Sequence, residues 1–501
     1  MVGSEVKPRG SVLGRFFGRM LAAVAPGWAL RRAQSRRQLL QLETHYDAAA
    51  MSRRTSGWSG PRGDANAVTA RSLQRLRDVC RDLVRNDPRA RAAKKRLGSY
   101  VVGTGIIPLI SASNPRVEAE AVEVWKSWTH NVNADYDGRL WFAGIQDLVV
   151  QACAESGGAL IVFEPAREID GLSVPLRIRI VEPDHIDESR DTFAAETGNP
   201  IVKGVETDGE GRRLAYWLFP THPEGGRVWR TESERVPASR VIHVYDVDRP
   251  GQMAGIPWMH AVITAMQDLG DFRDAQRMQA KIAACMVATV EDMSNSGTAI
   301  SEQDPNDELI EHFEPGQVLY PKPGQSIKFN TPPVPQDSSF SADTVREIAV
   351  GLGIPYEAVS GDYTSATFSS IQATRQDFQL TVNQIRQNVV IPQLCAGVFS
   401  RVMELAAALR GWGEVPTATW HGPPLPSAKP EQDARTFTAE VRSGKESLAS
   451  ALMKRGVPDT DEHLAKVARG FDQLDALDLV LDSDPRKVTG AGIMQVEQDD
   501  E

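Results

Sequence analysis

The first third of the chain places apolar residues at helical spacing and then changes to an extended pattern. The spacing predicts an amphipathic helix from Thr69 to Arg85, with Thr69 as its N-cap. The sequence Asn86-Asp87-Pro88 interrupts this pattern, and a second helix is predicted after it, through Leu97. The segment VVGTGIIP, which starts at Val101, then predicts a strand with close turns.

The next region, residues 140–250, is mostly typical of β-strands. Runs rich in β-branched residues start at Ala159, Leu176 and Val241. Between the last two, alternating apolar residues flank the sequence Asp208-Gly209-Glu210-Gly211. An Asp-Gly turn between alternating runs predicts a β-hairpin.

A helical period returns from Thr264 to Val290. Its apolar residues form one stripe, which we expect to pack inward on the same chain. On another face, Arg273, Arg277 and Lys281 align at i, i+4 and i+8. This basic stripe has two interpretations: a solvated charged face, or a surface that meets a neighbouring subunit or a polyanion.

The segment that follows is acidic. Residues 291–314 hold eight carboxylates and no Lys or Arg. Six of the carboxylates are clustered: Glu302, Asp304, Asp307, Glu308, Glu311 and Glu314. Because like charges repel, we do not expect this segment to hold phosphates by charge. Proline-rich strands are predicted after it, from Gln317.

Two further helices are predicted, with a polar loop between them. The first runs from about Ser341 to Leu352, and the second from about Ser370 to Leu409, where Pro392 should introduce a kink. The loop contains Gly361, Asp362, Tyr363, Thr364, Ser365, Ala366, Thr367, Phe368, Ser369 and Ser370. One helix thus leaves a mixed α/β body and another returns to it, with a small module between them, which describes a stalk.

The composition places the chain among ordinary globular proteins. Its 501 residues suggest about three structural units, and 41% hydrophobic with 24% charged residues excludes general disorder and fibres. The four cysteines lie far apart without a CxxC pair, which favours a reducing compartment. No run of about 18 apolar residues predicts a membrane span.

The net charge of −10 is unevenly distributed. Residues 1–100 hold 21 Lys and Arg against 7 Asp and Glu, whereas residues 459–501 hold 4 against 12. A basic end could contact phosphates, although a solvated helix face explains any single Arg equally well.

Catalytic and cofactor motifs are missing from the sequence. There is no GxxxxGK[ST] loop, no HExxH, no GxSxG and no EF-hand loop, so we expect no enzyme and no cofactor. His185 lies between Asp184 and Asp187, which could suggest a metal or acid–base site. We favour a loop histidine whose hydrogen bonds are satisfied.

Segments spread over residues 60–470 resemble the lambda-type family of tailed-phage portal proteins. The order and spacing of many segments carry this resemblance, and none of them is a catalytic motif. They include RDLVRNDPRARAAKKRLGSYVVGTGIIP from Arg81, GVETDGEGRRLAYWLFPTHP from Gly204, VPASRVIHVYDVDRPGQMAGIPWMHAVI from Val236, DLGDFRDAQRMQAKIAACM from Asp268, and REIAVGLGIPYEAVSGDYTSATFSSIQATR from Arg346.

The resemblance implies an α+β portal fold with named parts. It places a basic N-terminal arm at 1–60, an α/β wing at 61–263, a stem helix at 264–290, a clip at 291–338, a second stem helix at 339–359, a tunnel loop at 360–370, a long kinked wing helix and linker at 371–427, a helical crown at 428–481 and an acidic tail at 482–501.

The resemblance also implies function and partners. The chain would form a ring, usually of twelve subunits, at one capsid vertex of a virion assembled in the host cytoplasm. Double-stranded DNA would be packaged and ejected through its channel without sequence specificity. Terminase, a head-completion or adaptor protein and the major capsid protein would be partners, and a membrane would not. Two alternatives stay open: a minor capsid or adaptor protein that is not a portal, and a DNA-processing enzyme.

Overall fold

A computed structural model gives the positions of most of the chain. It describes residues 60, 63–195, 197–225, 232–284, 287–292, 325–330, 339–364, 366–423, 430–455, 457, 460–481, 484, 486 and 487, with the backbone alone for 282–284, 287–292 and 325–330. The chain divides into two units, Met1–Asp64 and Ala65–Glu501. All elements named below belong to the second unit. The predicted basic arm and most of the acidic tail lie outside the described residues.

The second unit begins with five helices and one strand. They are α3 (Ala65–Thr69), α4 (Leu73–Asn86), α5 (Pro88–Val101), β1 (Ile107–Ser111), α6 (Pro115–Thr129) and α7 (Phe142–Ser156). Asp87 caps α5, because its side chain accepts hydrogen bonds from the backbone N–H groups of Arg89 and Ala90.

Three local predictions in this region were wrong. Thr69 ends α3 and does not cap α4. Val101 ends a helix, so the predicted strand begins later, at Ile107. Helix α7 was predicted as part of a β region; it is buried on most sides, so its sequence lacks the one-sided apolar period that marks a surface helix.

Two antiparallel sheets form the middle of the unit. The first has the order β3-β2-β9 and the second the order β4-β5-β6-β7-β8. Their strands are β2 (Gly158–Pro165), β3 (Leu176–Val181), β4 (Thr192–Phe193), β5 (Pro200–Val202), β6 (Val205–Thr207), β7 (Arg213–Leu218), β8 (Glu234–Pro237) and β9 (Val241–Tyr245). Strands β6 and β7 confirm the predicted hairpin, in which the Asp208 carboxylate accepts the N–H groups of Glu210 and Arg212 at 2.9 and 2.7 Å.

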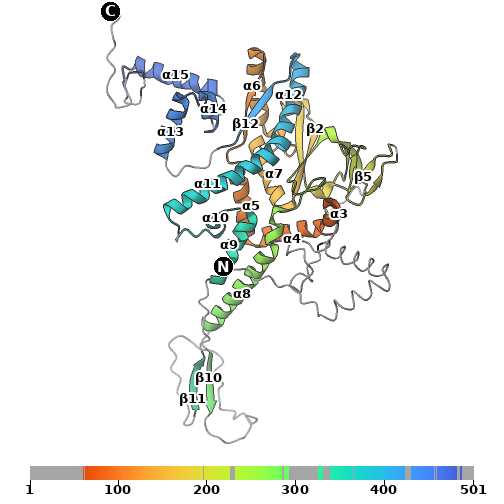
Figure 1. Ribbon diagram of the computed structural model, residues 1–501, viewed down its shortest axis with the longest axis vertical. Coiled ribbons are helices and arrows are strands. Elements are labelled where there is room, and N and C mark those ends of the chain that lie inside the picture. Colours follow the sequence, from red (N-terminus) through yellow and green to blue (C-terminus); the bar gives the residue numbers. More distant parts are fainter. Residues whose placement is uncertain are drawn as a thin grey trace, which may run out of the picture. The chain divides into compact units, whose positions relative to one another are not determined.

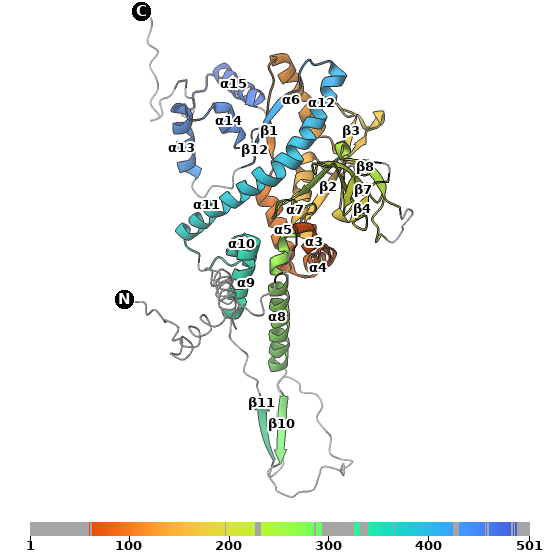
Figure 2. The same cartoon turned by 45° about the vertical axis from the view of Figure 1, so that its right-hand side comes forward.

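A long helical rod completes the body, as Figures 1 and 2 show. It consists of α11 (Phe368–Ile385), the π-helical segment η7 (Arg386–Cys395) and α12 (Ala396–Arg410). The long helix is confirmed, and Pro392 lies inside the π-helical segment, where its missing N–H group interrupts the regular ladder. The buried Arg386 guanidinium donates to the carbonyl oxygens of Val101, Tyr100 and Pro423 and so fixes η7 to the end of α5.

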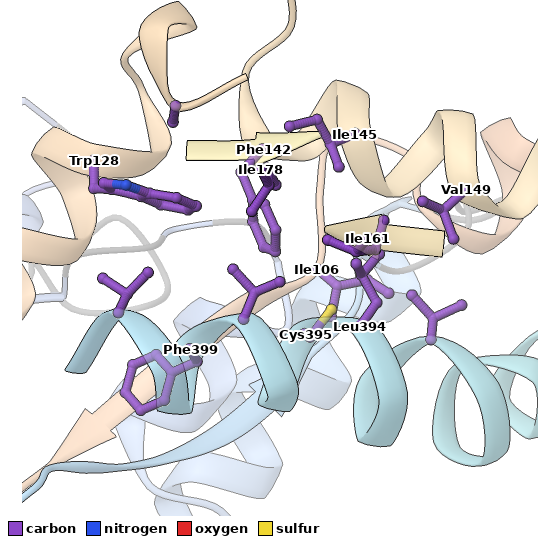
Figure 3. Packing of buried hydrophobic residues seen from close by; sticks show 14 of the residues in the cluster. Ile106, Trp128, Phe142, Ile145, Val149, Ile161, Ile178, Leu394, Cys395 and Phe399 are labelled. Carbon is purple, nitrogen blue, oxygen red and sulfur yellow. The ribbon is translucent and has the colours of Figure 1, made fainter. Parts of the chain in front are cut away.

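The main hydrophobic core lies between this rod, the first sheet, α6 and α7. In Figure 3, Leu394 of η7 points toward Ile161 of β2, and Cys395 and Ile178 belong to the same cluster. Among the described residues, Phe368–Arg410 is the one helix that is long and apolar enough, by length and composition, to cross a membrane. A candidate membrane span was not predicted here from the sequence. Half of its most apolar window is buried inside the protein, so this core accounts for its composition.

The remaining elements belong neither to the rod nor to the two sheets described above. They are η6 (Trp258–Val262), α8 (Ile263–Ala284), β10 (Val287–Asp292), β11 (Gln325–Asn330), α9 (Ser339–Leu352), α10 (Tyr356–Ser360), β12 (Thr417–His421), α13 (Pro430–Arg442), α14 (Leu448–Met453) and α15 (Thr460–Ala476). Strand β12 pairs with β1, and β10 pairs with β11, both antiparallel. The helix predicted to reach Val290 ends at Ala284, and a strand takes its last residues.

Candidate functional site

Helix α8 is anchored in the body only at its N-terminal half. Met266 and Leu269 are buried in a second apolar cluster, together with Val345 and Ile348 of α9. The ring of Phe272 then contacts that of Phe340, with centroids 4.7 Å apart. The start of α8 is therefore fixed against α9 by apolar contacts.

The second half of the apolar stripe of α8 is exposed within the single chain. Ala275 is exposed, and Met278 is 59% exposed. The prediction that the whole stripe packs inward on the same chain was therefore wrong at Ala275 and Met278. A helix can carry an apolar face that its own chain does not cover when another chain covers it.

The basic stripe of α8 lies in solvent. Arg273, Arg277 and Lys281 are all exposed in the described chain. Arg277 forms an ion pair with Asp274 at 2.7 Å on its own helix and donates to the carbonyl oxygen of Arg273 at 3.3 Å. Desolvation, with the nearby Arg89, lowers the pKa of Arg273. The stripe can meet phosphates or carboxylates, but it forms no enclosed site within one chain.

The loop after α10 is built from local hydrogen bonds. Gly361 ends α10 in the left-handed conformation at φ 73°, and its N–H donates to the carbonyl oxygen of Glu357 at 2.9 Å. The Asp362 carboxylate then accepts the N–H and the hydroxyl of Thr364 at 2.9 and 2.6 Å. These two bonds lower the pKa of Asp362 and favour its charged form.

The predicted loop ends earlier than the sequence suggested. Phe368, Ser369 and Ser370 form the first turn of α11, and Thr367 is its N-cap. The Thr367 hydroxyl accepts the N–H of Ser370 at 3.3 Å, while the Ser370 hydroxyl accepts the N–H of Thr367 at 3.0 Å. This reciprocal cap satisfies backbone N–H groups at the start of the long helix. Ser365 lies outside the described residues.

Two aromatic side chains give the loop its apolar surface. Tyr363 and Phe368 are 56% and 54% exposed. Tyr363 also borders a small cavity of about 80 Å³, together with Tyr100 of α5 and Phe378 of α11. The described loop therefore exposes an aromatic ring, hydroxyls and one carboxylate, and it carries no basic side chain.

The predicted acidic clip residues cannot be placed. Glu302, Asp304, Asp307, Glu308, Glu311 and Glu314 lie outside the described residues. Strands β10 and β11, which flank the acidic segment in sequence, pair from Val287↔Asn330 to Asp292↔Gln325. Six of the eight carboxylates of the acidic segment therefore come between two paired strands in the sequence, whereas Glu291 and Asp292 are the last residues of β10.

The region around His185 is a hydrogen-bonded turn. The His185 Nδ1 lies 2.8 Å from the carbonyl oxygen of Phe219, and burial lowers the pKa of the imidazole. Asp187 accepts hydrogen bonds from the Ser189 and Ser233 hydroxyls at 2.5 and 2.6 Å. This confirms the interpretation of His185 as a satisfied loop histidine.

One cluster in the described chain has atoms placed as metal ligands are: Glu182, Asp184 and His222. However, Arg81 donates to both oxygens of the Asp184 carboxylate, which also accepts the Gln74 amide. Although burial opposes it, the Arg81 guanidinium lowers the pKa of Asp184 to about 2. A bound cation would have to displace this guanidinium, so the residues fit an ion pair better than a metal.

The sequence predictions missed a basic groove beside β3. It is lined by residues of α4, α5 and α7 and by the last residues of β3, including Arg91, Lys95 and Arg179. The sequence signal was the run RARAAKK in α5, which interleaves basic residues with small ones. Its neighbours come from distant parts of the chain, so the groove could not be recognised from that run alone.

Comparisons of the sequence with known proteins identify its family. The family model for phage portal proteins of the lambda family matches residues 51–386. A probable portal protein of Halomonas phage phiHAP-1 is 24% identical over 499 residues, which cover 94% of each chain. The portal protein of Escherichia phage N15 is 21% identical, over 82% of this chain and 87% of that protein.

Solved structures give a more distant likeness. A chain from the neck of an empty GTA particle, computed with C6 symmetry, aligns with a TM-score of 0.46 at 15% identity, over 81% of this chain and 98% of that one. A chain from the neck of the native GTA particle, computed with C12 symmetry, gives 0.45 at 15% identity, over 78% and 94%. The match of the family model covers more than half of the sequence, and the chain belongs to the lambda family of phage portal proteins.

Proposed function

We propose that the chain assembles as a ring at one vertex of a viral capsid and forms the channel through which double-stranded DNA enters and leaves. The observation that carries this proposal is the family match over residues 51–386. The half-exposed apolar stripe of α8 supports it, because a helix face that one chain leaves uncovered can be covered by the next chain of a ring. The chain would act by its structure and not by catalysis.

In this ring, different parts of the chain would have different roles. Helices α8 and α9 would form the stem, with the basic stripe facing a neighbouring subunit or DNA. The loop from Gly361 to Thr367 would line the narrow part of the channel. Because it carries hydroxyls and no Lys or Arg, DNA of any sequence would slide past it more readily than along a basic loop.

The acidic segment, residues 291–314, would bind protein partners. Its eight carboxylates would repel phosphates, so we assign it to terminase during filling and to a head-completion protein afterwards. The wing would meet the major capsid protein. The assembled ring would be located in the virion, at the capsid vertex.

Native mass measurement and electron micrographs of the purified chain test the ring. We expect a closed oligomer with a central hole, of which a dodecamer is the form implied by the family. A monomer or dimer at every protein concentration would contradict the proposal.

Packaging into particles tests the loop. The double substitution T364K/A366K adds two positive charges and keeps the Thr367 cap, and T364S/A366S is the neutral control. We expect normal rings from both variants, but slower or shorter genome packaging with the lysine variant only, because phosphates would bind the loop. Equal packaging by both variants would reduce the loop to a connection between helices.

A further inference from the structure

The basic groove beside β3 forms one continuous surface. Two cavities of about 400 and 360 Å³ adjoin there and share Lys94, Glu155 and Glu182 in their walls. One wall is the helical pair α4 and α5, the floor includes α7, and the other wall is the end of β3. We call this surface the α5–β3 groove.

The wall formed by β3 is a sheet edge that Asp135 and Tyr136 cover at Ile178 and that is open at Ile180. Strand β3 is the outer strand in the order β3-β2-β9. The N–H of Tyr136 donates to the outward carbonyl of Ile178 at 2.9 Å. Because outward and inward residues alternate along an antiparallel strand, Ile180 also directs its N–H and carbonyl away from β2. In the described chain neither group has another backbone partner, and Ile180 lines the larger cavity.

The charge of the groove is positive once its internal pairs are removed. Glu155 pairs with Lys94, and Glu182 lies 3.5 Å from Arg81. The Asp135 carboxylate accepts three backbone N–H groups of its own turn. Asp137 also lines the larger cavity, and no ion pair is recorded for it in the described chain. The basic side chains without an ion pair in the described part of the chain outnumber this carboxylate; they are Arg91, Lys95, Arg139 and Arg179.

The groove also offers apolar surface beside these charges. Tyr136 and Leu148 are 44% and 40% exposed, and Leu140 and Ala152 lie with them in the wall of the larger cavity. The guanidinium of Arg177 lies 4.9 Å from the centroid of the Tyr136 ring, which holds the ring in place. An apolar side chain can therefore be buried next to unpaired cations.

We propose that the α5–β3 groove binds an extended acidic peptide segment of another protein, which adds a strand to the free edge of β3. The peptide backbone would pair with Ile180, one of its apolar side chains would enter the cavity beside Leu148, and its carboxylates would meet Arg91, Lys95 and Arg139. Strand addition explains the open edge, and charge complementarity selects the sequence. This inference is independent of DNA passage.

The observations favour a peptide over a nucleic acid. A phosphate backbone has no N–H and carbonyl groups in strand register to pair with Ile180, and it would leave the apolar surface at Leu148 exposed. Nucleic acid is therefore the competing outcome of the experiment.

The probe is a fluorescent peptide of alternating Val and Glu, whose binding to the full-length purified chain is followed by anisotropy. Two control peptides separate the contribution of charge from that of backbone hydrogen bonds. The first has Lys in place of Glu. The second has the same side chains, but alternate backbone nitrogens are methylated. We expect binding of the first peptide, and binding at least about tenfold weaker for each control, because each removes one source of recognition.

Charge reversal on the protein gives the second measurement. The variant K95E/R139E should bind the acidic peptide about tenfold more weakly, whereas R410E/R442E, which reverses two exposed arginines outside the groove, should bind it as the unmodified chain does. Equal binding of the methylated peptide would overturn the strand addition. Absence of peptide binding, or binding of duplex DNA that K95E/R139E alone abolishes, would overturn the peptide as occupant.

Discussion

The body of the second unit and helix α8 differ in how completely one chain covers their apolar side chains. In the body, Trp128 is fully buried and its indole N–H donates to the carbonyl oxygen of Leu176 at 2.9 Å. On α8, Met278 is 59% exposed although it continues a stripe that begins with fully buried residues. The body thus has the core of an independent domain, while α8 carries apolar surface that its own chain leaves uncovered.

Charged groups in the second sheet and on α8 differ in the same way. Glu206 of the second sheet is fully buried and pairs with Arg235 at 2.7 Å, with further hydrogen bonds from Thr197 and Asn199. On α8, Arg277 and Asp274 form a pair whose side chains are 69% and 72% exposed. A buried and saturated pair resists change strongly, whereas an exposed pair contributes about 0–1 kcal/mol.

The largest expected effect is in the main hydrophobic core. Trp128→Ala should lower the free energy of unfolding by about 3–5 kcal/mol, because it leaves a cavity and an unpaired carbonyl. Urea unfolding of the purified chain measures this loss. Trp141→Ala is the matched control, since Trp141 is 53% exposed, and it should change stability by less than about 0.5 kcal/mol. Equal losses in both variants would remove the distinction between core and surface.

The second prediction concerns the apolar stripe of α8. Met278→Asp should leave the stability of the single chain within about 0.5 kcal/mol of the original, because the side chain is already in solvent. It should nevertheless abolish ring assembly, since a ring interface would bury the new charge. Native mass spectrometry compares it with Met278→Leu, which should assemble. Normal rings from the aspartate variant would show that this face is not an interface.

The sequence predicted elements that depend on neighbouring residues. The hairpin at Asp208 was correct because its turn is made by hydrogen bonds within five residues. The pairing of β1 with β12 could not be predicted, because Ile107 meets His421 across most of the chain. Helix α7 was missed since Gln146 and Gln151 are buried within it, which removes the polar face that marks a helix.

The candidate sites show the same difference between features set by neighbouring residues and features set by residues far apart in the sequence. The basic stripe was predicted, because it depends on spacing along one element. The exposed half of α8 was predicted to be buried, since periodicity identifies an apolar face but not the chain that covers it. The α5–β3 groove joins α5 to residues near 139 and 180, and no local pattern relates these segments.

The third prediction concerns Glu206, which is buried in the second sheet and pairs with Arg235. Hydrogen bonds from Arg235 hold the pKa of Glu206 at about 2, below its ordinary value of 4.5. The stabilisation is therefore complete above about pH 4.5 and is lost as the pH falls toward 2. Glu206→Gln should lower stability at neutral pH by about 1–3 kcal/mol and weaken the acid dependence between these limits.

Unfolding measured from pH 7 to pH 2 gives this dependence. Glu210→Gln provides the control, because Glu210 pairs with Arg212 in the same sheet while both side chains are more than 70% exposed. The control should retain the acid dependence of the original chain. An unchanged pH profile for Glu206→Gln would mean that other carboxylates cause the acid sensitivity of the chain.

The smallest expected effect is at the basic stripe. Arg277→Ala breaks one exposed pair, so the free energy of unfolding should change by less than about 0.5 kcal/mol. The triple substitution of Arg273, Arg277 and Lys281 by Glu should also leave the single chain folded, because all three side chains lie in solvent.

The triple variant then separates the two interpretations of the stripe. Repetition around a ring multiplies a small charge effect, so reversal should reduce ring assembly, measured by native mass, or the length of packaged DNA. The equally exposed Arg410 and Arg442, changed to Glu together, provide the control for net charge. If rings of normal mass form and genomes of full length are packaged, the stripe is a solvated face, and the second half of α8 contributes to the ring only through its apolar side.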